Sequence, residues 1–175
     1  MEREGANKML TKWRASWHRH MAFVAVLAPA CLVGGGTAEA GSPVNTGYFG
    51  GVAIKGYDPV AYFAEGKPMK GSEEFSLDWL GATWLFATAG HRDLFAEQPV
   101  KYAPQYGGHC SAGVAFGENT IDIDPEAWSI VDGKLYLQYS KSGVEEWKQH
   151  QEEWIARADE NWPEVKARVE DAPGG

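Results

Sequence analysis

Cysteine is scarce in this sequence of 175 residues, which contains only Cys31 and Cys110. Cys31 lies in an N-terminal segment that we expect to be removed, so the remaining chain has one thiol and no intramolecular disulfide. Its stability must therefore come from packing. A single cysteine also forms no CxxC pair, the usual sign of a thiolate metal site.

A hydrophobic run long enough to cross a membrane is also lacking. The apolar segment 21–33 has about a dozen residues and contains Pro29, which is too short for a transmembrane helix. Basic residues precede it and the small residues Ala38 and Ala40 follow it, a pattern typical of a secretory signal peptide. We therefore expect a signal peptide over 1–40, cleaved near Ala40, and a periplasmic or secreted protein. An uncleaved amphipathic anchor is the alternative, and the sequence around Cys31 is a poor lipoprotein signal.

Positive charge is scarce beyond residue 40, where 11 Lys and Arg face 21 Asp and Glu. Nucleic acids and anionic membrane surfaces repel acidic proteins. We therefore exclude nucleic acid as a partner, together with stable membrane insertion after signal cleavage. Possible partners are a metal ion or another periplasmic protein.

Alternating apolar residues predict two β-hairpins in the mature chain. The first spans 75–87, with its turn near Gly81. The second spans 128–139 and contains Asp132-Gly133, among the strongest hairpin signals in a single sequence. Together they predict a small antiparallel sheet.

Capping signals predict helices around these hairpins. Asp58 with Pro59 starts a short helix that Gly66 ends, and Thr88 caps another helix that stops before Pro99. The pair Asp124-Pro125 has the same N-cap pattern and is also assigned to a helix start.

A longer amphipathic helix is predicted at the C-terminus. Ser142 and Glu145 form a capping box, and the tryptophans that follow have helical spacing. This helix should lay its tryptophans on the sheet. The class is therefore α+β, a compact single domain over 48–165, with a flexible mature N-terminus over 41–47 and a frayed tail over 166–175.

Four blocks of sequence resemble the exported single-domain YHS proteins of bacteria. They are KGYDPVAYF (55–63), GATWLFATAGHRDLFAEQPVKYAPQYGGHC (81–110), DPEAWSIVDGKLYL (124–137) and ADENWP (158–163). The resemblance implies a compact α+β domain associated with the handling of copper or another heavy metal. The segments 58–61 and 86–88 lack the cysteines of YHS modules in metal-transport proteins. The resemblance also implies a cysteine at position 110, an aromatic residue at 109 and asparagine at 91, so His109 and His91 are departures.

Cys110, His109 and His91 are the candidate metal ligands. A thiolate and imidazoles suit copper or zinc, and three such ligands make a minimal site. Neighbouring residues on an extended strand point apart, but Gly107-Gly108 makes a turn plausible before the pair. Met69 is a possible further ligand. The leading hypothesis is a non-enzymatic metal-binding or metal-handling accessory protein.

Two other interpretations remain open for Cys110. In one, the thiol is buried and inert, as free cysteines commonly are, and the protein is a structural or partner-binding domain. In the other, Cys110 is the nucleophile of a thiol-dependent enzyme, with His91 or His109 as its base and Asp93 or Asp122 as the orienting acid. An intermolecular disulfide or redox role for the thiol is a further possibility.

Overall fold

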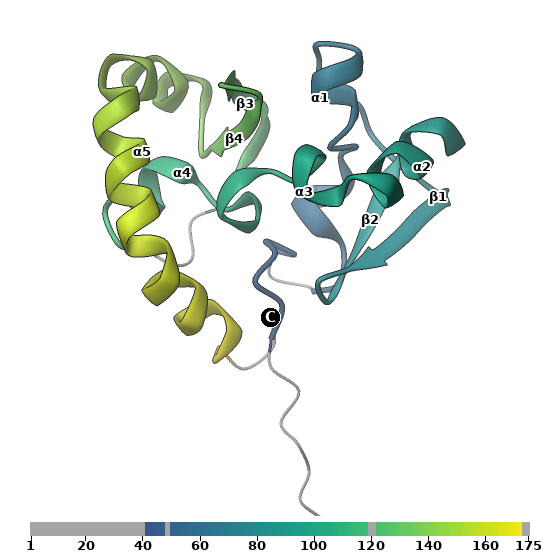
Figure 1. Cartoon of the computed structure of the whole chain (residues 1–175), viewed down its shortest axis with the longest axis horizontal. Helices are drawn as coiled ribbons and strands as arrows, with labels where there is room; N and C mark the ends of the chain where they lie inside the picture. The colour runs from purple at the N-terminus through teal and green to yellow at the C-terminus, as the bar shows by residue number, and fades with distance from the viewer. Residues whose placement is uncertain (1–40, 48–49, 119–121, 173–175) are drawn as a thin grey trace, which may run out of the picture. The chain divides into compact units, whose positions relative to one another are not determined.

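Two β-hairpins and several helices make up the described part of the chain, which in the computed structural model covers 41–47, 50–118 and 122–172 (Figure 1). These residues belong to one unit, Ala38–Gly175. The predicted signal peptide over 1–40 lies outside the described residues.

The first hairpin is formed by β1 (Ser72–Trp79) and β2 (Ala82–Phe86), which pair antiparallel. Leu80 and Gly81 join them with φ angles of 51° and 74°, as a tight turn matching the twist of the strands requires. The prediction over 75–87 is confirmed. Two short helices precede this hairpin in the chain and two follow it: η1 (Ala53–Gly56), α1 (Ala61–Ala64), α2 (Ala89–Glu97) and α3 (Pro99–Tyr102).

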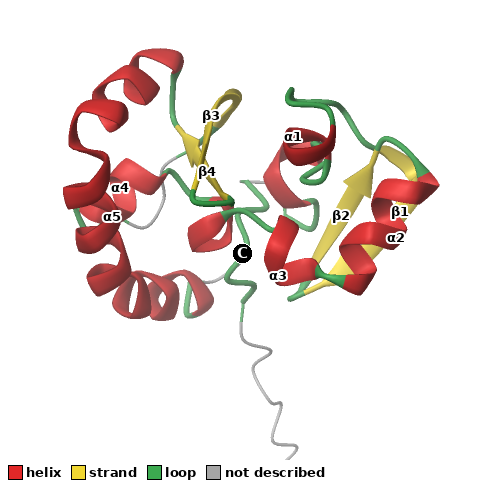
Figure 2. Ribbon diagram, turned by 45° about the horizontal axis from the view of Figure 1, so that its top comes forward, coloured by secondary structure: helices red, strands yellow, loops and turns green. Residues whose placement is uncertain are grey.

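The second hairpin is formed by β3 (Asp124–Val131) and β4 (Lys134–Gln138), joined through Asp132-Gly133. It forms its own two-stranded sheet, separate from β1–β2 (Figure 2), so the hairpins do not share one sheet. Two short helices precede it, η2 (Gln105–Gly108) and α4 (Ser111–Ala115). The α+β class is confirmed.

The expected helix start at Asp124-Pro125 is wrong, because both residues lie in β3. Asp124 pairs with Gln138 in the antiparallel register, and proline is tolerated near the beginning of a strand. The carbonyl of Pro125 accepts a hydrogen bond from the Tyr62 hydroxyl at 3.0 Å. Asp124-Pro125 therefore begins a strand and not a helix, because β4 provides a pairing partner for Asp124.

The C-terminal helix is α5 (Lys141–Glu170), which contacts α4 and the β3–β4 hairpin. Its cap is Ser140, whose hydroxyl accepts the Gly143 amide, so the predicted cap at Ser142 is two residues late. The prediction of a frayed tail from residue 166 is also wrong for 166–170, which belong to α5. Val169 is buried, and packing extends the helix beyond the expected boundary at 165.

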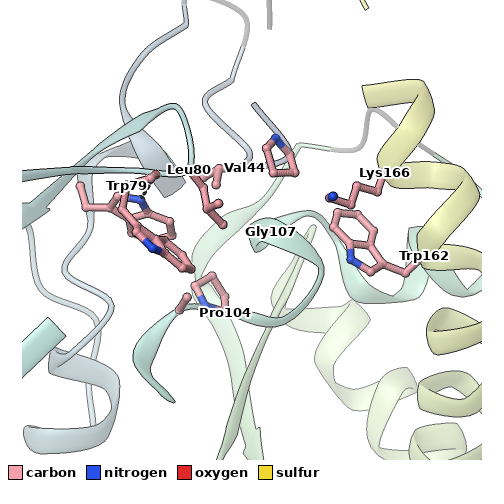
Figure 3. Close-up of a pocket in the computed structure, with 10 residues that line it drawn as sticks. Val44, Trp79, Leu80, Pro104, Gly107, Trp162 and Lys166 are labelled. Carbon is pink, nitrogen blue, oxygen red and sulfur yellow. Dashed lines mark hydrogen bonds between the residues drawn. The ribbon is translucent and has the colours of Figure 1, made fainter. Parts of the chain in front are cut away.

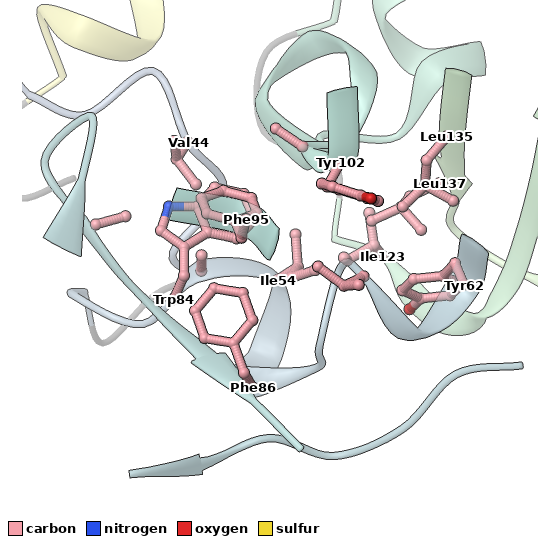
Figure 4. Packing of buried hydrophobic residues seen from close by; sticks show 14 of the residues in the cluster. Val44, Ile54, Tyr62, Trp84, Phe86, Phe95, Tyr102, Ile123, Leu135 and Leu137 are labelled. Carbon is pink, nitrogen blue, oxygen red and sulfur yellow. The ribbon is translucent and has the colours of Figure 1, made fainter. Parts of the chain in front are cut away.

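Two hydrophobic clusters lie on either side of β4. Leu135 and Leu137 belong to one cluster and Tyr136 to the other, because successive side chains of a strand point to opposite faces. The first cluster includes Trp84, Phe95 and other residues shown in Figure 4. The second contains buried tryptophans of α5, which contact the sheet as predicted. Burial of these aromatics supplies the core that a chain without a disulfide needs.

The segment 41–47 is held in place, contrary to the predicted flexibility. The Gly41 amide donates to the Glu170 carbonyl at 2.8 Å, and the Asn45 amide donates to Gly107 at 2.9 Å. Val44 is only 3% exposed. The partner residues are far from 41–47 in the sequence, so the composition of this segment does not predict the contacts.

Candidate functional site

Cys110 is a buried residue at the start of α4. Its side chain is 4% exposed and belongs to the first hydrophobic cluster, with Sγ 3.6 Å from the Gln138 Oε1. Burial raises the pKa of the Cys110 thiol, although nearby backbone amides oppose this effect. A protonated thiol is a poor nucleophile and a poor metal ligand. This environment supports the inert-thiol interpretation.

His109 points away from the thiol beside it in sequence. Its ring packs against Trp162 of α5, with centroids 6.1 Å apart, whereas Cys110 packs in the first cluster. The backbone of His109 is extended, with φ −72° and ψ 160°, and neighbours in extended chain diverge. The turn at Gly107-Gly108 ends before His109, so it does not bring the His109 and Cys110 side chains together.

The imidazole of His109 is buried without hydrogen bonds. Neither ring nitrogen has a partner among the described residues, although the Pro43 carbonyl is close enough to favour the charged form. Desolvation outweighs that carbonyl and lowers the pKa of His109 to about 4. The folded protein therefore holds His109 neutral at physiological pH.

We expect this neutral histidine to make the fold sensitive to acid. Because its native pKa lies below the value near 6.5 of an unfolded histidine, the unfolded chain binds more protons between those two values. Stability should therefore fall by about 3 kcal/mol from this group as the pH drops from 6.5 to 4. Urea unfolding at several pH values measures the loss.

His109→Phe should remove most of that pH dependence, since it keeps an aromatic ring without a titrating group. His150→Gln is the matched control, because His150 is exposed on α5. Equal pH dependence in His109→Phe and the unchanged protein would contradict the prediction.

His91 lies in the first turn of α2 and pairs with a residue that the metal-site hypothesis did not include. Its Nδ1 is 2.6 Å from Oδ2 of Asp58, and Nε2 is 3.9 Å from Oε1 of Glu65. No group of three or more His, Cys, Asp and Glu side chains in the described ranges is arranged to hold a metal ion. The structure therefore does not assemble Cys110, His109 and His91 into the expected site.

Asp58 is fully buried and accepts four hydrogen bonds. Oδ1 accepts the amides of Val60 and Ala61, and Oδ2 accepts the amide of Ala87 and Nδ1 of His91. The predicted N-cap position is two residues early, because the N-cap of α1 is Val60, although Asp58 does accept amides at the start of this helix. The sequence gave no sign of its link to His91, because the two residues are 33 positions apart.

The other candidate side chains are engaged elsewhere. Asp93 pairs with Arg92 at 2.7 Å, and Asp122 pairs with Lys55 at 2.9 Å. The Lys55 ammonium lowers the pKa of the Asp122 carboxyl. Met69 supplies its backbone carbonyl to the Asp58 amide. The expected acids of a thiol triad thus make surface ion pairs.

An apolar cavity of about 150 Å³ lies between four segments that are distant in sequence (Figure 3). Trp79 lies on one side, with the Trp84 ring 5.9 Å from its own, and Trp162 and Lys166 of α5 lie on the other side (Figure 3). The remaining lining residues are Pro43, Val44, Leu80, Ala103, Pro104 and Gly107. The sequence analysis assigned the tryptophans to the core and did not find this cavity.

Lys166 is the charged side chain that lines this cavity. It lies one helical turn after Trp162, so both side chains are on the same face of α5. Its ammonium is 3.2 Å from Oε1 of Glu170, and the side chain is 44% exposed. The cavity therefore combines aromatic walls with a solvated cation.

No family model matches the chain, and comparisons with curated proteins and with solved structures give no match. The resemblance to exported YHS proteins therefore stays a prediction. In the described part of the chain, no helix has the length and apolar character needed to cross a membrane.

Proposed function

We propose that the protein is an exported, non-enzymatic binding domain that holds a small apolar carboxylate in the tryptophan-lined cavity. The cavity is the observation that carries this proposal. It has a volume of about 150 Å³ and is open on one side, and an enclosed apolar cavity of that volume accepts benzene. The buried, protonated thiol of Cys110 has a structural role in this proposal.

The walls favour a flat apolar group. Trp79, Trp84 and Trp162 present aromatic surfaces, and Pro43 and Pro104 add rigid aliphatic ones. Aromatic rings favour offset or edge-to-face contacts with other rings. An aromatic ring or a short aliphatic chain of similar size satisfies this lining.

Lys166 selects for negative charge on that group. Its ammonium has three donors, and Glu170 occupies only part of this capacity. A carboxylate on the ligand would receive a charge-assisted hydrogen bond. Uncharged ligands of the same shape would lack this contact.

Benzoate and toluene form a matched pair of probes for the cavity. Binding is followed by shifts in the amide and indole NMR signals of Trp79 and Trp162. We expect both probes to shift these signals. Lys166→Met should weaken benzoate binding about tenfold, the effect of losing one charged hydrogen bond, and should leave toluene binding unchanged.

Lys148→Met is the control for this substitution. Lys148 is also on α5 and also pairs with a glutamate, Glu145 at 2.9 Å, but it does not line the cavity. Failure of both probes to bind would overturn the proposed function. Benzoate binding that does not depend on Lys166 would overturn the preference for carboxylates alone.

A further inference from the structure

We propose that Nε2 of His91 and the carboxylate of Glu65 bind a divalent transition-metal ion, with Cu²⁺ preferred. The site is separate from the tryptophan-lined cavity and does not rest on it. Asp58 is its positioning residue. This ligand pair keeps one of the three residues expected from the sequence and replaces the other two.

The hydrogen bonds of Asp58 determine which nitrogen of His91 is free. A carboxylate only accepts hydrogen bonds, so the contact of 2.6 Å between Oδ2 and Nδ1 requires a proton on Nδ1. In a neutral imidazole, the lone pair is then on Nε2. Asp58 is itself fixed by three backbone amides, so the orientation of the ring is fixed as well.

A histidine held in this way has the arrangement found at metal centres. Metal-bound imidazoles commonly donate their second ring nitrogen to a carboxylate, which orients the ring and makes the ligating nitrogen more basic. In His91 the nitrogen bound to Asp58 is Nδ1, and Nε2 is the nitrogen that faces Glu65.

Glu65 supplies the second ligand at a suitable distance. Its Oε1 lies 3.9 Å from Nε2, too far for a hydrogen bond. Two ligands that each lie about 2 Å from one ion are roughly 3 Å apart. The Glu65 side chain is 47% exposed, so a small rotation closes this gap, and water completes the coordination.

Copper is preferred over zinc for this ligand set. One imidazole, one carboxylate and water suit Cu²⁺, which binds most tightly of the divalent first-row metals to a given set of nitrogen and oxygen ligands. The alternative state of the pair is a protonated His91 in an ion pair with Glu65. Such a pair binds no metal, so the two states give opposite results on titration.

The test is a titration of the full chain with Cu²⁺, followed by paramagnetic broadening of amide NMR signals. We expect selective broadening at 62–66 and 89–92. His91→Asn should abolish this broadening or raise the copper concentration that it needs at least about tenfold, while keeping a donor for Asp58. Glu65→Gln should weaken it by several-fold.

His150→Asn and Cys110→Ser are the controls and should leave this broadening unchanged. Broadening that persists in His91→Asn, or that does not occur at 62–66 and 89–92 in the unchanged protein, would overturn the proposal. Binding lost in Cys110→Ser but kept in His91→Asn would restore the thiol as the ligand.

Discussion

Replacing Asp58 with alanine is expected to lower the free energy of unfolding by about 4 kcal/mol. The substitution leaves the buried amides of Val60 and Ala61 and the partly buried amide of Ala87 without their acceptor, and it removes the partner of His91. A buried donor without a partner costs about 1–3 kcal/mol. Urea unfolding monitored by circular dichroism gives the change.

Two variants are compared with Asp58→Ala: Asp58→Asn is the conservative substitution, and Asp93→Ala removes an exposed carboxylate as the control. Asparagine keeps an acceptor for Val60 and Ala61 but turns an NH₂ group toward Ala87 and His91, so we expect an intermediate loss. The Asp93 side chain is 64% exposed, and its removal should change stability by less than about 0.5 kcal/mol. A loss below about 1 kcal/mol in Asp58→Ala would contradict this account of the buried carboxylate.

Gly107→Ala is expected to destabilise the fold by about the same amount, for a steric reason. Gly107 has φ +61°, and a Cβ there would collide with the Pro43 carbonyl oxygen and come within 3.3 Å of the Val44 Cα. Neither the Pro43 oxygen nor the Val44 Cα can move without disturbing the hydrogen bond from the Asn45 amide to the Gly107 carbonyl. We expect a loss of about 4 kcal/mol, from positive φ and overpacking together.

Gly66→Ala separates these two contributions. Gly66 has nearly the same φ, +64°, but a Cβ there would meet nothing within 4 Å. It should cost only about 1–2 kcal/mol, the effect of positive φ on a residue with a Cβ. Equal losses for both variants, measured by urea unfolding, would show that the segment 41–47 is not fixed against Gly107.

The local elements could be predicted because their signals are short in sequence. Asp132-Gly133 forms the turn of the second hairpin, since both residues adopt positive φ. Thr88 accepts the His91 amide as an N-cap. Each of these outcomes depends on backbone conformations within a few residues. The cap of α5 was predicted less well, since it is Ser140 and not the expected Ser142.

The candidate sites could not be predicted in the same way. His109 and Cys110 are adjacent in the sequence, yet His109 packs against Trp162 and Cys110 packs in the first hydrophobic cluster. Their side chains diverge because the backbone at His109 is extended. His91 meets Asp58 across 33 positions. The cavity needs Val44, Trp84 and Trp162 from three separate segments. No spacing rule connects such residues.

Local signals in the sequence are thus sufficient for the α+β class, both hairpins and the Thr88 cap of α2, because hydrogen bonds and alternation between near neighbours decide them. Long-range packing decides that Cys110 is buried with a raised pKa, that His91 faces Asp58 and Glu65, and that tryptophans line a cavity beside Lys166. These features depend on which distant surfaces bury one another. Burial also sets the protonation of the thiol and of the His109 imidazole, since desolvation disfavours their charged forms.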